Sequence, residues 1–235
     1  MTLRLLLLSN STEHGKGYLD HAMPAVLDFL GPVRQLLFVP FALRDRDAYT
    51  ARVRSRFAKE GIDVRGVRPE GSEAAVVEAA EALFVGGGNT FRLLDTLQRT
   101  GLLEALRRRA RRGVPYLGAS AGTNVAAPTI KTTNDMPIVQ PASFAALDLV
   151  PFQINPHYVD PDPSSRHMGE TREERLREFL EDNDAVVVAL REGAWLRVEG
   201  RRATLGGSRG ARIFRRGRDP EEVSPGAALD ALLTD

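Results

Sequence analysis

Short apolar runs alternate with amphipathic segments along the first half of the chain. The runs predict strands at Leu5–Leu8, Leu36–Val39, Ile62–Val67, Ala82–Val85 and Val114–Leu117. The segments between them predict helices at Leu19–Leu30, Tyr49–Glu60, Glu73–Ala80 (with Ser72 as N-cap) and Phe91–Arg112 with a break at Gly101. Because buried strands separated by helices are typical of parallel sheets, we expect an α/β sheet covered by helices on both faces.

The second half follows a different pattern. Residues Thr123–Leu149 predict a long functional loop region with one short helix, and Thr171–Glu181 predicts an amphipathic helix. Further strands are predicted at Phe152–Asn155, Ala185–Leu190, Ala194–Glu199, Arg202–Leu205 and Ala211–Phe214. Tight turns join the last of these, so the sheet is expected to end in antiparallel hairpins. Neither a repeat nor a linker interrupts the pattern, which predicts one α/β domain over residues 1–235.

Composition narrows the possible functions. The chain has 235 residues, with 32 basic against 31 acidic side chains, so it lacks the basic excess that is typical of nucleic-acid binding. It has no cysteine, which excludes disulfides, thiolate metal sites and a cysteine nucleophile. The apolar segment Leu3–Leu8 is too short for a membrane span and lacks a small-residue cleavage site. We therefore expect a soluble, cytoplasmic protein without a membrane partner.

The strongest chemical motif is Gly118-Ala119-Ser120-Ala121-Gly122, which fits G-x-S-x-G. It directly follows a predicted strand and precedes a possible helix, the context that a nucleophile elbow requires. Ser120 is therefore a candidate nucleophile. A simple turn between strand and helix is the alternative interpretation of this segment.

A second loop, Gly86-Gly87-Gly88-Asn89, follows the predicted strand at Ala82–Val85. Ligands of open α/β sheets bind beyond the carboxyl ends of the strands, so this loop and Ser120 are expected to be neighbours. The loop lacks the spacing of nucleotide-binding motifs. Backbone N–H groups of Gly88 and Ala121 are candidates for an oxyanion hole, and a glycine-rich helix start without a ligand is the alternative.

The candidate general base is His157, which lies just past a predicted strand and can take the proton of a serine hydroxyl. Two carboxylates are candidates to orient its imidazole: Glu192, at a strand end, and Asp135, in a polar run. The alternative is a metal site made of His157, Asp160, Asp162 and His167. Asp-Pro pairs within this group are typical of turns, so no metal or other cofactor is predicted.

Seven stretches, in this order, resemble peptidase E, a family of aspartyl dipeptidases with a serine nucleophile. The match runs from about residue 5 to about residue 207, and the seven stretches together are specific although each alone is weak. The stretches are Leu6–Thr12 (LLLSNST), Val85–Phe91 (VGGGNTF), Ser120–Gly122 (SAG), Thr132–Val139 (TTNDMPIV), Gln153–Tyr158 (QINPHY), Gly169–Arg172 (GETR) and Glu192–Gly193.

The resemblance implies hydrolysis of dipeptides that begin with aspartate. It implies Ser120 as nucleophile, His157 as base and Glu192 as the third member, with Asp135 also important for activity. It further implies a three-layer α/β sandwich like that of the class I glutamine amidotransferases. The order Ser, His, acid along the chain agrees with this fold, whereas α/β-hydrolases have the order Ser, acid, His.

Substrate-binding residues are expected near this triad. Arg172 is the first candidate to bind the aspartate side chain and Lys131 the second, because a carboxylate needs a cation or several donors. Asn89 is a further candidate, and Glu170 or Asp135 would hold the free amine of the peptide. Two departures from the family pattern, Ala119 and Arg191 (where a proline is familiar), affect the expected pocket shape.

Two other functions are compatible with the sequence. One is a cyanophycinase-like hydrolase that cuts a longer aspartate-rich polymer, and the other is an amino-acid-binding module without catalysis. The expected partner is a small peptide, and a homodimer is possible.

Overall fold

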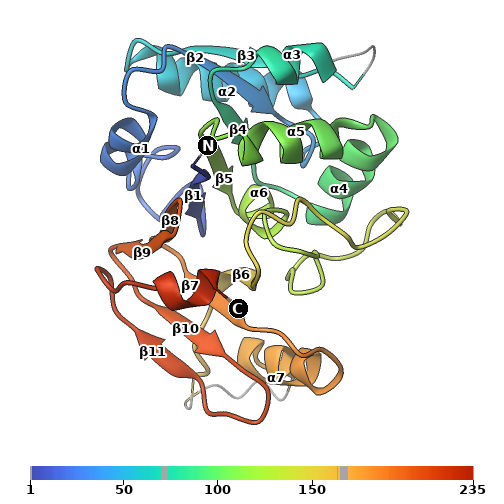
Figure 1. Cartoon of the computed structure of the whole chain (residues 1–235), viewed down its shortest axis with the longest axis vertical. Coiled ribbons are helices and arrows are strands. Elements are labelled where there is room, and N and C mark those ends of the chain that lie inside the picture. The colour runs from blue at the N-terminus through green and yellow to red at the C-terminus, as the bar shows by residue number, and fades with distance from the viewer. Residues whose placement is uncertain (1, 70–73, 163, 165–168, 235) are drawn as a thin grey trace.

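The fold is that of a computed structural model, which describes residues 2–69, 74–162, 164 and 169–234. Its strands form two sheets, which lie in the upper and lower parts of Figure 1. The predicted N-cap Ser72 and the candidate ligand His167 lie outside the described residues.

The larger sheet has seven strands in the order β3-β2-β4-β5-β1-β8-β9. Strands β3, β2, β4, β5 and β1 run parallel to one another, and β8 and β9 are antiparallel additions at one edge. The strands are β1 (Arg4–Leu8), β2 (Gln35–Val39), β3 (Asp63–Gly66), β4 (Leu83–Val85), β5 (Tyr116–Ala119), β8 (Ala194–Glu199) and β9 (Arg202–Gly207).

Alternating side chains of these strands pack into two hydrophobic clusters, one on each face. In β1, Leu5 and Leu7 join one cluster, while Leu6 and Leu8 join the other. Helices α1 (Met23–Leu30) and α2 (Arg46–Ala58) contribute to the cluster of Leu6 and Leu8. The other cluster includes side chains of α3 (Ala74–Ala79), α4 (Thr90–Arg99) and α5 (Leu102–Arg111). The sheet is thus covered on both faces, as predicted. Within the described residues no helix is long and apolar enough to cross a membrane.

The smaller sheet has the order β11-β10-β7-β6 and lies next to α7 (Figure 1). Val188 of β7 faces the large cluster that also holds Leu5, whereas Val187 and Ala189 pack with Leu176 of α7. Since one cluster includes side chains from both sheets, we propose that residues 1–235 form a single domain. The elements are β6 (Gln153–Tyr158), α7 (Arg172–Asp182), β7 (Val187–Arg191), β10 (Ala211–Phe214), β11 (Glu221–Val223) and a terminal 3₁₀ turn at Asp230–Leu233.

The mixed α/β class and the mostly parallel central sheet agree with the prediction, and so does the hairpin of β8 and β9 at the sheet edge. Strands β7 and β10 differ from it, because they pair with each other in a second sheet, where β7 also pairs with β6. Strand β11 has no counterpart in the sequence prediction. The likeness to class I glutamine amidotransferases stays a prediction.

Two helices begin at other residues than the sequence pattern predicted, and local chemistry explains both differences. Helix α1 begins at Met23 instead of Leu19, because Pro24 is tolerated in the first turn but would disrupt a helix interior. Helix α2 begins at Arg46 instead of Tyr49, because the Asp45 carboxylate accepts a hydrogen bond from the Ala48 N–H and caps the helix. This earlier start places Tyr49 inside the helix, where its side chain reaches the site described next.

Candidate active site

Ser120 lies in the turn between β5 and α6 (Ala121–Asn124) with a φ of 54°. Such a left-handed backbone is unfavourable for a residue with a side chain, and it is typical of strained turns that present a nucleophile. Close packing against β4 explains why the last position of the G-x-S-x-G motif, Gly122, is a glycine. A Cβ at this position would collide with the backbone carbonyl of Val85, so the turn can pack against β4 only with glycine there.

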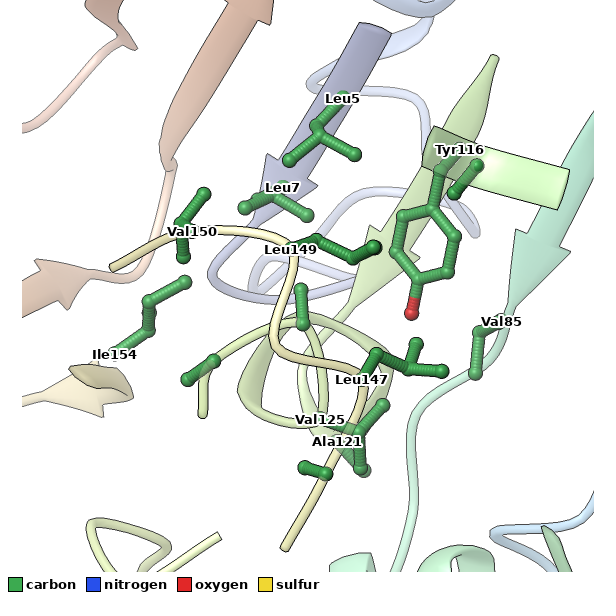
Figure 2. Close-up of a cluster of buried hydrophobic side chains, with 14 of the residues drawn as sticks. Leu5, Leu7, Val85, Tyr116, Ala121, Val125, Leu147, Leu149, Val150 and Ile154 are labelled. Carbon is green, nitrogen blue, oxygen red and sulfur yellow. The ribbon is translucent and has the colours of Figure 1, made fainter. Parts of the chain in front are cut away.

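The short helix α6 holds the turn in place. Figure 2 shows Ala121 and Val125 packed among apolar side chains that include Val85 and Leu147. The Thr123 hydroxyl donates a hydrogen bond to the Leu8 carbonyl at 2.6 Å. These contacts fix the backbone next to Ser120 at the carboxyl ends of β1, β4 and β5.

His157 lies in β6, where the pairing with β7 shifts register between Asn155 and Tyr158. Its φ is 55°, again in the left-handed region. Irregularities of this kind redirect a side chain, and they are frequent beside active sites. The backbone N–H of His157 donates to the hydroxyl of buried Ser9 at 2.9 Å, and that hydroxyl donates to the Leu190 carbonyl at 2.9 Å. Ser9 thus ties the end of β1 to β6 and β7.

Three side chains meet between the two sheets. The His157 Nε2 atom lies 2.7 Å from Ser120 Oγ, and its Nδ1 atom lies 2.7 Å from Glu192 Oε1. An ionised carboxylate only accepts hydrogen bonds, so Nδ1 carries the hydrogen and Nε2 of the neutral ring accepts that of the serine. The side chains of His157 and Glu192 are 36% and 56% exposed, which lets water reach the site.

Glu192 follows β7 and is held through its neighbour Gly193. The Gly193 N–H donates to Asn10 Oδ1 at 2.8 Å. Asn10 comes directly after Ser9, so the loop after β1 supports the backbone of both His157 and Glu192. Sequence reasoning did not assign a role to either residue, although both belong to the matched stretch LLLSNST.

Asp135, a candidate to orient the imidazole of His157, contacts Thr90 instead. Its Oδ2 atom accepts hydrogen bonds from the N–H and the hydroxyl of Thr90, at 2.7 Å and 2.6 Å. Among the described contacts it makes none with His157, whose ring is bonded to Glu192 instead. Asp135 therefore supports the N-terminus of α4, where a negative charge is favourable.

Asn89 also caps α4. Its Oδ1 accepts from the Arg92 N–H at 3.0 Å, and its Nδ2 donates to the Met136 carbonyl at 2.9 Å. Both polar atoms of the predicted substrate-binding side chain are thus engaged within the protein. The adjacent glycine loop is held from the other side, because the Gly87 N–H donates to the Tyr49 hydroxyl at 2.9 Å.

A cavity of about 230 Å³ opens beside Ser120 and His157. Gly88, the predicted oxyanion donor, contributes to its wall, and Ala121 is the first residue of α6, where N–H groups lack helical partners. Three further lining residues carry no signal in the sequence, because they come from α2 and the loop before α1. These residues are Tyr18, Tyr49 and Arg52.

The other predicted substrate-binding residues do not line this cavity. Lys131 Nζ donates to Asn183 Oδ1 at 3.1 Å, and Glu170 pairs with Arg175 at 3.4 Å. Arg172 begins α7, where burial lowers the pKa of its guanidinium and the nearby charge of Asp135 opposes that effect.

The alternative metal cluster is not assembled in the described residues. No group of three or more metal-ligating side chains comes together there. Asp160 is instead bound by Arg191 at 2.6 Å and 2.7 Å, and Arg191 also pairs with Glu222 of β11 at 2.6 Å. Arg191, which departs from the family pattern, therefore joins the loop after β6 to β11 of the smaller sheet. It also holds the pKa of the Asp160 carboxyl below its usual value.

A serine hydroxyl, an imidazole and a carboxylate in line at the ends of strands are the arrangement of serine-type peptidases. Comparisons with known proteins agree with this class. The model of Peptidase family S51 matches residues 5–206. The chain therefore belongs to peptidase family S51.

Similar proteins share nearly the whole length of the chain. A protein named Peptidase E from Streptomyces coelicolor is 64% identical over 231 residues, which are 98% of this chain and 95% of that protein. A probable alpha-aspartyl dipeptidase from Drosophila melanogaster is 50% identical over 232 residues, covering 97% of each. The crystal structure of a peptidase from an acI-B1 Actinobacterium has the same fold, with a TM-score of 0.73, 16% identity and 96% coverage of both chains.

Proposed function

We propose that this protein is a serine dipeptidase that hydrolyses dipeptides with an N-terminal aspartate. One observation carries the proposal: Ser120, His157 and Glu192 form an unbroken line of contacts, each of 2.7 Å. The names of the relatives, Peptidase E and probable alpha-aspartyl dipeptidase, support the substrate class.

The first half of the reaction forms an ester on Ser120. The Ser120 oxygen attacks the peptide carbonyl carbon while His157 Nε2 takes the hydroxyl proton. The Glu192 carboxylate stabilises the imidazolium that results and keeps Nδ1 protonated. His157 then gives the proton to the leaving nitrogen, the C–N bond breaks, and the second amino acid departs.

The second half returns the enzyme to its starting state. A water molecule gives a proton to His157 Nε2 and attacks the ester carbonyl. The bond to Ser120 breaks, the serine oxygen regains the proton from His157, and aspartate is released. The exposed edge of the imidazole gives water a route to this position.

The negative charge that develops on the carbonyl oxygen needs hydrogen-bond donors in both halves of the reaction. The backbone N–H groups of Gly88 and Ala121 are proposed for this role, because Gly88 lines the cavity and Ala121 begins a helix directly after the nucleophile. One such donor contributes about 3–4 kcal/mol to the transition state in known cases. Asp135 and Asn89 act indirectly, since they hold the start of α4 next to Gly88.

The small cavity favours a dipeptide over a polymer. Its volume of about 230 Å³ lies below the range of about 300–1,000 Å³ that holds drug-sized ligands. A homodimer remains a prediction, and neither a metal nor a cofactor is part of the proposed chemistry.

The test compares the wild-type protein with Ser120→Ala and His157→Ala, using Asp-Leu and chromatographic detection of free leucine. Each substitution is expected to lower kcat by about 10⁴- to 10⁶-fold, because the triad acts as a unit. A phosphonofluoridate probe should label wild-type Ser120 and fail on Ser120→Ala. Tight aspartate binding without probe labelling or turnover would favour a binding module instead, and efficient cleavage of a long aspartate polymer would favour the cyanophycinase-like alternative.

A further inference from the structure

A permanent positive charge lies in the wall of the cavity beside Ser120. Among the described residues that line it, Arg52 is the permanently charged side chain, and the only other titratable side chains are His157 and two tyrosines. Among the residues that the structure describes, no carboxylate belongs to the lining, which consists of Asn10, Ser11, Thr12, Tyr18, Leu43, Tyr49, Arg52, Gly87, Gly88, Ser120 and His157. A group bound here therefore meets positive charge, which favours an anion.

Arg52 has no competing anion among the described residues. In the part of the chain that the structure describes it makes no ion pair, and its side chain is exposed. Arg56, one turn further along α2, differs because it pairs with Asp20 at 3.0 Å and with Glu60 at 2.7 Å. A guanidinium without a carboxylate partner keeps its donors free for a ligand.

The part of α2 that carries Arg52 is placed relative to the nucleophile through Tyr49. These two residues are three positions apart on α2, so they share one face of the helix. The Tyr49 hydroxyl accepts the N–H of Gly87 at 2.9 Å. Gly87 in turn lies against the nucleophile, since a Cβ on it would lie 2.9 Å from Ser120 Cβ. One hydrogen bond and the close approach of Gly87 to Ser120 thus connect the arginine-bearing helix to the turn of the nucleophile.

Two tyrosines complete the wall around Arg52. The Tyr18 and Tyr49 hydroxyls are 3.2 Å apart, and the rings meet edge to face. Burial raises the pKa of both phenols, so both hydroxyls remain protonated and neutral. They therefore add hydrogen-bonding capacity to the wall and no negative charge that would cancel the guanidinium.

The length of an aspartate side chain matches this arrangement. Its carboxylate carbon is separated from the scissile carbonyl carbon by three C–C bonds of about 1.5 Å each, so the two lie within about 4 Å. With the carbonyl at Ser120, the carboxylate stays inside the same small cavity. We propose that Arg52 binds the side-chain carboxylate of the N-terminal residue of the substrate and thereby determines the preference for aspartate. This inference rests on the proposed function, and it assigns to Arg52 the role that the sequence suggested for Arg172.

The first experiment measures kcat and KM of the wild type and Arg52→Gln on Asp-Leu and Asn-Leu, which differ in one charge. Loss of a charge-assisted contact is expected to lower kcat/KM for Asp-Leu by about 10- to 100-fold, mainly through KM. The value for Asn-Leu should change by less than about 3-fold, so the ratio between the two substrates collapses. Arg52→Lys should recover part of the ratio, because it restores the charge without the planar fork.

Two matched controls accompany this series. Arg44→Gln removes an exposed arginine near the start of the same helix, outside the catalytic cavity, and should leave both substrates unchanged. Arg172→Gln should retain the ratio between Asp-Leu and Asn-Leu. The inference is overturned when Arg52→Gln keeps the wild-type ratio, or when Arg172→Gln abolishes it and Arg52→Gln does not.

A binding measurement separates this inference from the proposed reaction. Calorimetric titration of Asp-Leu into Ser120→Ala, with and without Arg52→Gln, needs no turnover. A Kd about 10-fold or more weaker with Arg52→Gln supports the inference even where the wild type hydrolyses nothing, an outcome that would remove only the proposed reaction. An equal Kd in both proteins overturns the assignment of Arg52 even where the wild type is an active dipeptidase.

Discussion

The hydroxyl of Ser9 accepts a hydrogen bond from the backbone N–H of His157 at 2.9 Å, across 148 positions of the sequence. Ser9 is fully buried, and its own hydrogen goes to the Leu190 carbonyl. One hydroxyl therefore joins the first strand of the larger sheet to the irregular end of β6. The left-handed backbone of His157 is held by this contact as well as by its strand.

Ser9→Ala is expected to lower kcat by about 10-fold with little change in KM, because it loosens the imidazole relative to Ser120 and touches no substrate. Steady-state kinetics with Asp-Leu checks the effect, with circular dichroism to verify folding. Ser55→Ala, at an exposed position of α2, is the control. A folded Ser9→Ala protein with wild-type kcat would show that β6 alone fixes the imidazole.

Glu192→Gln and Asp135→Asn should separate the two carboxylates by their effects. The first is expected to lower kcat by about 10²- to 10⁴-fold at nearly unchanged stability, because an amide no longer fixes the tautomer or stabilises the imidazolium. The second should cost about 1 kcal/mol of unfolding free energy, because it removes a charge from the N-terminus of α4. Steady-state kinetics and urea unfolding of both variants measure the two effects. A large loss of kcat in Asp135→Asn with a normal kcat in Glu192→Gln would contradict the contacts of His157.

Gly122→Ala should destabilise the protein by about 1–3 kcal/mol, because the new methyl group meets the rigid backbone of β4. It should also displace Ser120 and lower kcat. Gly217→Ala provides the comparison: its φ is 66° and its Cβ position is open, so only the left-handed backbone is penalised, by about 1 kcal/mol. Urea unfolding of both variants measures the difference, and equal losses without a kinetic effect at Gly122 would refute the close approach.

The free energy of unfolding should decrease as the pH decreases, because of His21. Burial lowers the pKa of this imidazole below its ordinary value of 6.5, and the opposing charge of Glu13 only partly offsets the effect. The unfolded chain therefore binds a proton more readily than the folded one between the lowered pKa and about 6.5. This contribution to stability is present above that window and is lost as the pH falls through it.

His21→Gln should flatten this part of the stability profile. Urea unfolding at several values between about pH 7.5 and 5 measures the slope for the wild type and the variant. His14→Gln, which replaces an exposed histidine, is the control. An unchanged slope in His21→Gln would assign the pH dependence to another group.

Local patterns predicted where the strands and helices lie in the sequence better than they predicted which strands pair with each other. The run Leu5–Leu8 identified β1, and alternation of its leucines between two clusters follows directly from strand geometry. The run that became β7 was also found, but its pairing with β6 and β10 depends on contacts between distant segments. A hydrophobic pattern shows that a strand buries its side chains and does not specify which strand lies beside it.

The site shows the same division. Ser120 and His157 carry recognisable chemistry at strand ends, so sequence could propose them. Arg52 could not be found in this way, because one arginine among 29 has no distinguishing neighbour until α2 folds against the glycine loop. Asn89 was predicted to bind substrate, yet its side chain caps α4, a role that Ser, Thr, Asp and Asn share at helix starts.

The nucleophile belongs to one sheet and its base to the other. A shear of about 1 Å between the sheets would stretch the contact of Ser120 with His157 beyond the reach of proton transfer, while every ladder within each sheet stayed paired. Turnover therefore reports the mutual alignment of the sheets more sensitively than any measure of secondary structure. Under mild heating or low urea, catalysis should cease while the far-ultraviolet spectrum still has its native shape.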